Sequence, residues 1–89
     1  YGPVTTLSAA AADKSLNDSA NGIPLVYPGA TVRVSGFTGV GTTANGMRTV
    51  VSRTASKLIL SGGAALVDDA AGEAVTLQFR EPLGVLTEA

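Results

Sequence analysis

Three acidic side chains that lie close together in the sequence, Asp68, Asp69 and Glu73, are the first candidates for chemistry. Calcium is bound by several carboxylates on one loop, so such a cluster could form a calcium site. The spacing lacks the alternating oxygen ligands and the central glycine of a calcium loop. We therefore interpret the cluster as a solvated turn with Glu73 at the entrance of a strand, and we predict no metal site.

Four arginines on the expected strands, Arg33, Arg48, Arg53 and Arg80, are the second candidate group. A nucleic-acid-binding face would interleave aromatic side chains with basic ones, and only Phe79 closely neighbours one of these arginines. The net charge of −1 gives no reason to expect binding to nucleic acid or to an acidic membrane. We expect these arginines on exposed faces or in salt bridges between subunits.

Serine and threonine are abundant, but a catalytic nucleophile needs an activating base. The chain has no histidine and no cysteine, which leaves only Lys14 and Lys57 for that role. The glycines of Gly39-Val40-Gly41 and Gly46 superficially resemble a phosphate-binding loop, but no Gly-Lys-Ser/Thr motif leads into a helix. We interpret them as a hairpin loop, and we predict no enzymatic activity, no cofactor and no small-molecule substrate.

The composition indicates one domain whose surface is short of charge. The chain has 89 residues, of which 45% are hydrophobic, 4% aromatic and 15% charged. Soluble domains carry about 25% charged residues, and an undercharged surface tends to be covered by a partner. No apolar run approaches the ~20 residues of a membrane span. The start, Tyr1-Gly2-Pro3, lacks a signal peptide and an initiator Met, so we expect a processed chain or a piece of a longer one.

The elements that must position these side chains are strands organised around residues 28–37. Pro28-Gly29 opens this segment as a turn, and Gly36 closes it. Its residues alternate between a core face (Ala30, Val32, Val34) and a solvent face (Thr31, Arg33, Ser35). The period of two predicts a central strand.

Similar patterns predict its neighbours. We expect strands at residues 4–7, 47–53, 57–61 and 73–80, a turn or single helical turn at 8–12, a loop at 17–22, an edge segment at 23–27, and a hairpin at Asn45-Gly46. The fold class is therefore all-β, a small antiparallel β-sandwich or β-barrel with short turns and little helix. Within the single domain we expect an N-terminal arm and loop (1–22), a β core (23–81) and a C-terminal tail (82–89).

The apolar phase of each strand predicts the core and the surfaces left for partners. The expected core is Val32, Val34, Leu58, Leu60, Val75, Leu77 and Phe79. Ile59 should face outward beside Val51 or Val50, which indicates either a second packed surface or a two-sheet sandwich. The tail is apolar where a chain end is normally polar. The expected interface residues are Ile59, Leu83, Val85 and Leu86, with Arg33 and Arg80 at the rim.

Residues 29–79 also resemble a module of tailed-bacteriophage virion proteins. The matching stretches are Gly-Ala-Thr-Val-Arg-Val-Ser-Gly-Phe-Thr (29–38), Asn-Gly (45–46), Thr-Val-Val-Ser-Arg-Thr-Ala-Ser-Lys-Leu-Ile-Leu (49–60) and Leu-Val-Asp-Asp-Ala-Ala-Gly-Glu-Ala-Val-Thr-Leu (66–77). The family pattern usually carries an apolar residue where this chain has Arg53. The inward or outward phase of strand 47–53 therefore stays open.

The resemblance implies a repeated, non-enzymatic subunit of a phage-like virion, assembled in the bacterial cytoplasm with identical subunits and other virion proteins. Tail tube is the first expectation and capsid decoration the alternative. A host-surface or carbohydrate-binding β module is the alternative from another class. Such a module would be expected to expose Trp or Tyr, and this chain has no Trp.

Overall fold

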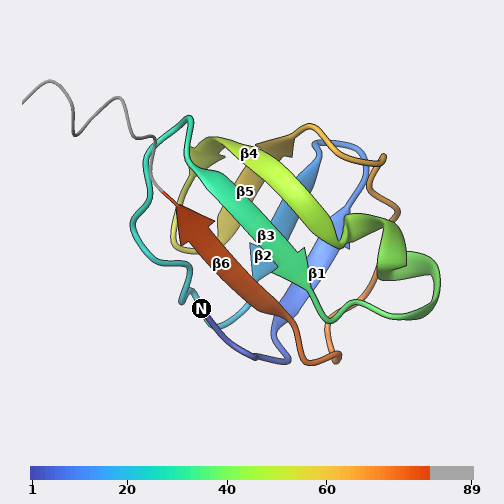
Figure 1. Cartoon of the computed structure of the whole chain (residues 1–89). Helices are drawn as coiled ribbons and strands as arrows, with labels where there is room; N and C mark the ends of the chain where they lie inside the picture. The colour runs from blue at the N-terminus through green and yellow to red at the C-terminus, as the bar shows by residue number, and fades with distance from the viewer. Residues whose placement is uncertain (81–89) are drawn as a thin grey trace, which may run out of the picture.

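Residues 1–80 are described by the computed structural model, and the six strands among them form one antiparallel sheet (Figure 1). The sheet order is β1-β2-β5-β4-β3-β6. The strands are β1 (Leu7–Ala10), β2 (Ser15–Asp18), β3 (Thr31–Ser35), β4 (Gly46–Arg53), β5 (Lys57–Ser61) and β6 (Thr76–Arg80). The only helix in this part of the chain is the six-residue 3-10 helix η1 (Gly39–Ala44). The all-β class and the small helix content are thus confirmed.

Strand β3 has a partner on both sides, as its alternation predicts. It pairs with β4 and with β6, both antiparallel. Val32 and Val34 are buried, while Arg33 and Ser35 are exposed. Each strand pair joins residues of the same face, so β3 fixes which side chains of β4 and β6 point inward.

A β-bulge in β4 decides the phase that the sequence left open. Val50 lies opposite Leu60, whereas beyond the bulge Arg53 lies opposite Leu58. Leu58 and Leu60 are both buried, so Val50 and Arg53 share the inward face although they are an odd number of residues apart. The bulge adds one residue to β4, so the inward and outward positions alternate in opposite phase before and after it.

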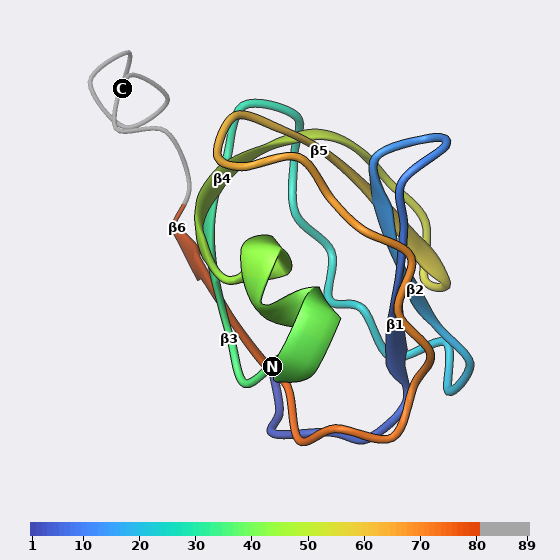
Figure 2. The same ribbon diagram turned by 90° about the vertical axis from the view of Figure 1, so that its right-hand side faces the viewer.

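The sheet curls so that β1 and β2 face β3 and β6, with η1 between them in the side view (Figure 2). Residues before β1 run along the edge of β6, where Val4 and Val75 exchange two backbone hydrogen bonds of 2.9 Å. Ala9 of β1 forms a second isolated bridge with Asp69. These bridges connect the two ends of the sheet and produce an incomplete barrel around one core.

The core contains six of the seven predicted residues in fully buried positions. The exception is Phe79, the penultimate residue of β6, which is only partly buried. The sequence prediction did not include several further core members, namely Leu7, Leu16, Ile23, Val26, Phe37, Val50 and Leu66.

The expectation of an arm and loop at residues 1–22 is wrong in its secondary structure. The first strand is β1 rather than residues 4–7, and β2 occupies part of the stretch expected as a loop. Small and polar residues fill both strands, so their intrinsic preference for β structure is weak. Pairing with β5 and burial of Leu7 and Leu16 override that preference. The segment 23–27 forms no strand, although Ile23 and Val26 pack into the core.

Candidate functional site

The outward face of β4, β3 and β6 brings Arg33 and Arg80 together. Arg33 lies between Met47 of β4 and Gln78 of β6, and Arg80 lies opposite Thr31 in the next row. These side chains, with Phe79, line a shallow hollow of about 320 Å³, which we call the β3–β6 hollow.

The lining of the β3–β6 hollow is basic and apolar. Met47 is 58% exposed, and both arginines are exposed. No carboxylate is among the described lining residues. Within residues 1–80 the only salt bridge joins Lys57 Nζ to Asp13 Oδ2 at 2.5 Å, on another part of the surface. The hollow therefore presents two positive charges and a thioether to whatever contacts it.

The neighbouring edge of β6 is covered along part of its length. Leu77 N donates to Tyr1 O at 2.7 Å, and Tyr1 N donates to Leu77 O at 2.6 Å. The next bridge toward the start of β6 is the one between Val4 and Val75. Beyond Leu77, Gln78 to Arg80 extend past this N-terminal segment, directly beside the β3–β6 hollow.

Of the other predicted interface residues, the structure describes only Ile59, and it lies away from the β3–β6 hollow. Ile59 is half-buried on β5, which β4 and β3 separate from β6. Its cross-strand neighbours are Ser15 and Ser52, not Val50 or Val51 as expected, because the bulge shifts the register. Its place in an interface stays a prediction. Leu83, Val85 and Leu86 lie outside the described residues.

Arg48 overturns the expectation that the strand arginines are exposed. The residue is 5% exposed and lies on the inward face, opposite Val32. Burial lowers the pKa of the guanidinium from its usual value. The alternation of β4 carries the signal that was missed, because Arg48 has the same phase as Val50.

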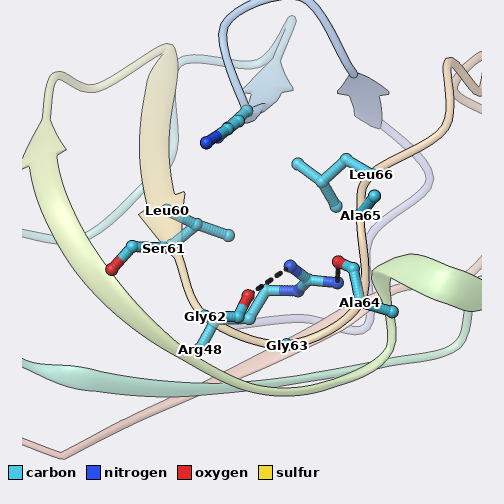
Figure 3. A pocket seen from close by; sticks show the side chains of 9 residues that line it. Arg48, Leu60, Ser61, Gly62, Gly63, Ala64, Ala65 and Leu66 are labelled. Carbon is cyan, nitrogen blue, oxygen red and sulfur yellow. Dashed lines mark hydrogen bonds between the residues drawn. The ribbon is translucent and has the colours of Figure 1, made fainter.

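The Arg48 guanidinium holds two loops together through backbone carbonyls (Figure 3). On the η1 side, Nε donates to Ala44 O at 3.0 Å and Nη2 donates to Thr43 O at 2.6 Å. On the side of the loop after β5, Nη1 donates to Gly62 O at 2.9 Å and Nη2 donates to Ala64 O at 2.7 Å. All four acceptors are neutral, so no carboxylate compensates the buried charge through these bonds.

The acidic cluster is divided among separate structural contacts. Asp68 Oδ1 accepts from Ala11 N at 2.8 Å, and Glu73 accepts from the backbone N–H and hydroxyl of Thr38. The neighbouring side chain of Glu73 raises the pKa of Asp69, while the hydrogen bonds from Thr38 lower the pKa of Glu73. Across residues 1–80 no three or more His, Cys, Asp or Glu side chains gather in a way that could hold a metal ion.

Comparison with known proteins adds no relative: a scan of family models, a search of curated proteins and a search of solved structures each return no significant match. None of the helices in the described part of the chain has the length and apolar character needed to cross a membrane.

Proposed function

We propose that this chain is a non-enzymatic structural subunit of a phage-like virion that assembles with identical subunits and other virion proteins through the β3–β6 hollow. The observation that carries the proposal is the grouping of Arg33 and Arg80 with the exposed Met47, beside the end of edge strand β6. Arginine and methionine are both enriched where proteins bind one another. Strand β6 lies at one end of the sheet order, and a strand in that position can pair with a further strand.

The virion context rests on the resemblance of residues 29–79 to tailed-bacteriophage modules. Tail tube is the preferred location, and capsid decoration is the alternative within the same class. The apolar residues Leu83, Val85 and Leu86, with Ile59, belong to the proposal as further contacts.

A host-surface or carbohydrate-binding module is the alternative from another class, and one observation favours it. Tyr27 is 63% exposed and Leu25 is 68% exposed, on the segment between β2 and β3. An exposed aromatic ring can stack on a sugar, although one such ring is a small platform.

Charge reversal at the hollow tests the assembly proposal. The association of the 89-residue chain is measured by sedimentation velocity over a concentration series, with electron microscopy of the same samples. We expect concentration-dependent oligomers, seen as tubes or ring-like pieces. Arg33→Glu and Arg80→Glu should weaken them, because each new carboxylate would repel the acidic partner groups that the arginine attracts. Lys57→Glu is the matched control, because it makes the same charge change on β5.

A second variant ending at residue 81 tests the contribution of the tail. Weaker association of this variant than of the full chain is expected if Leu83, Val85 and Leu86 make contacts. Monomers of every variant at all concentrations would contradict self-assembly. Unchanged oligomers in both arginine variants would show that another surface carries it.

A further inference from the structure

We propose that Arg48 and Lys14 form a binding site for a single carboxylate group. The two side chains line a hollow of about 320 Å³ at the loop that follows β5, here called the Arg48 hollow. Its remaining lining is Leu60, Ser61, Gly62, Gly63, Ala64, Ala65 and Leu66. This site is separate from the β3–β6 hollow and does not depend on the proposed assembly function.

The charge balance of the Arg48 hollow favours an anion. Two basic side chains line it, and no acidic one does. A buried cation is costly unless it is paired, and the hydrogen bonds of Arg48 all end on neutral carbonyl oxygens. An anion in the hollow would compensate a charge that the fold has already desolvated.

The donors that remain indicate a small anion with few oxygens. A guanidinium has five N–H donors, and the four bonds of Arg48 leave one N–H on Nη1. The Lys14 side chain also lines the hollow, and its ammonium carries three N–H donors. Two carboxylate oxygens can be satisfied by these groups, whereas a phosphate presents more acceptors than they can serve.

The apolar part of the lining indicates what should be attached to the carboxylate. Leu60 is 2% exposed and Leu66 is 7% exposed. Figure 3 shows these two side chains and Ala65 lining the hollow beside Arg48. A short alkyl chain would contact these side chains while its carboxylate meets the cations. Both a free small carboxylic acid and a glutamate side chain of another protein have this chemistry.

Loop 62–64 gives a direct spectroscopic readout of binding, because Arg48 is bonded to the carbonyls at both of its ends. The 15N-labelled chain is titrated with sodium propionate and, separately, with N-acetyl-glutamate α-amide, against sodium chloride and sodium phosphate at equal ionic strength. We expect saturable shifts of the Gly62, Gly63 and Ala64 amides with propionate. Binding of the amide as well would assign a protein side chain as a source, and binding of propionate alone would assign a free acid.

Lys14→Gln tests the site without removing the loop hydrogen bonds that Arg48→Gln would lose. We expect it to weaken propionate binding about fivefold, the upper range for a partly exposed charge pair. Lys57→Gln is the control and should bind as the parent does, and unchanged amide spectra elsewhere confirm that each variant is folded. The proposal is overturned by absence of a saturable shift, by equal effects of chloride or tighter binding of phosphate, or by equal affinity of Lys14→Gln.

Discussion

At the scale of single residues, Asp18 is a buried carboxylate that accepts four hydrogen bonds from residues 1–22. It is 1% exposed and accepts from Tyr1 Oη and Thr6 Oγ1, each at 2.5 Å, and from the N–H groups of Ala20 and Gly22, each at 3.0 Å. Burial by itself raises the pKa of this carboxyl, but the hydrogen bonds from Thr6, Tyr1, Ala20 and Gly22 outweigh it and hold the pKa below its usual value. Asp18 is therefore ionised at neutral pH and joins Tyr1 and the loop after β2 to the β1–β2 pair.

We predict that Asp18→Asn destabilises the protein by about 2 kcal/mol at pH 7, because an amide replaces one of two acceptor oxygens with a donor. A lowered folded-state pKa contributes stability that is present above the unfolded pKa and lost as pH falls through the folded one. The difference between parent and variant should therefore shrink below pH ~4. Urea unfolding at both pH values measures it, with Asp68→Asn, whose carboxylate accepts a single backbone hydrogen bond, as control. An equal difference at the two pH values would rule out the charge as the cause.

The contribution of Asp69 to stability should depend on pH in the opposite direction from that of Asp18. Its Oδ2 is buried without a hydrogen-bond partner among the described residues, and the neighbouring side chain of Glu73 raises its pKa. We infer that a proton shared with Glu73 satisfies this oxygen at acidic pH. A raised folded-state pKa gives stability that is present below the unfolded pKa and lost as pH rises through the folded one.

Asp69→Asn should therefore stabilise the protein at neutral pH, because the amide donates to Glu73 at every pH. Thermal unfolding at pH 5 and pH 8 measures the change, and the gain should be larger at pH 8. Asp68→Asn is the control: it weakens the bond with Ala11 N and should bring no gain. A loss of stability in Asp69→Asn at both pH values would show that the proton is not shared.

At the scale of elements, the turns are where glycine conformation decides stability. Gly46 opens β4 with φ +118°, a backbone conformation that favours glycine. A Cβ on Gly46 would have open space around it, whereas a Cβ on Gly36, with φ +107°, would lie 2.1 Å from Ala74 O. A substitution at Gly46 would therefore strain the backbone only. A substitution at Gly36 would strain the backbone and also clash with the Ala74 carbonyl.

Gly46→Ala should accordingly cost about 1 kcal/mol, and Gly36→Ala clearly more. Chemical unfolding of the two variants provides the comparison. If Gly46→Ala were neutral, the strained conformation would not be maintained in solution. Equal costs at the two positions would mean that the Gly36 contact relaxes freely.

The strands after residue 27 could be predicted from the sequence because alternation and turn residues agree there. Pro28-Gly29 and Asn45-Gly46 bound the segments correctly, and β5 has the predicted limits of residues 57–61. Strands β1 and β2 could not be predicted, since their alanine, serine and asparagine residues have no strong local preference. Lys14, with φ +55°, turns the chain between them without a glycine or proline to mark the place.

The candidate sites could be predicted only in part for a related reason. Arg33 and Arg80 were selected as rim residues, but their shared hollow depends on the register of β3 against β6. Arg48 was expected on the surface, because its burial requires carbonyl acceptors from two loops that no local pattern predicts. The placement of Lys14 and Arg48 around one hollow likewise depends on long-range folding.

At the scale of the whole molecule, the core predicts where truncation is most damaging. Leu60 is 2% exposed in the middle of the curled sheet, whereas Phe79 is partly buried near its end. Leu60→Ala should cost roughly 2–5 kcal/mol, and Phe79→Ala less than the 3–5 kcal/mol usual for a buried phenylalanine. Urea unfolding measures both. A greater loss at Phe79 than at Leu60 would contradict this ranking of the two core positions.

The closure of the barrel joins the first residues of the described chain to its last strand. Val4 N donates to Val75 O, Val75 N donates to Val4 O, and Leu77 N donates to Tyr1 O. Val4→Pro removes the first of these donors without changing the residues of β6. We therefore expect faster hydrogen exchange at the amides of Val75 and Leu77, by about fivefold for one lost hydrogen bond.

Two controls separate local opening of the closure from general loss of stability. The amide of Leu60 donates to Lys14 O at 2.9 Å on the opposite side of the sheet, so its exchange should not change. Thr5→Pro places the same ring at an exposed neighbour that donates no backbone hydrogen bond to another described residue, and it should leave Val75 and Leu77 protected. Equal acceleration at Leu60 would mean that Val4→Pro acts on global unfolding. No acceleration at Leu77 would mean that its hydrogen bond to Tyr1 O persists without the Val4 donor, and that the two parts of the closure open independently.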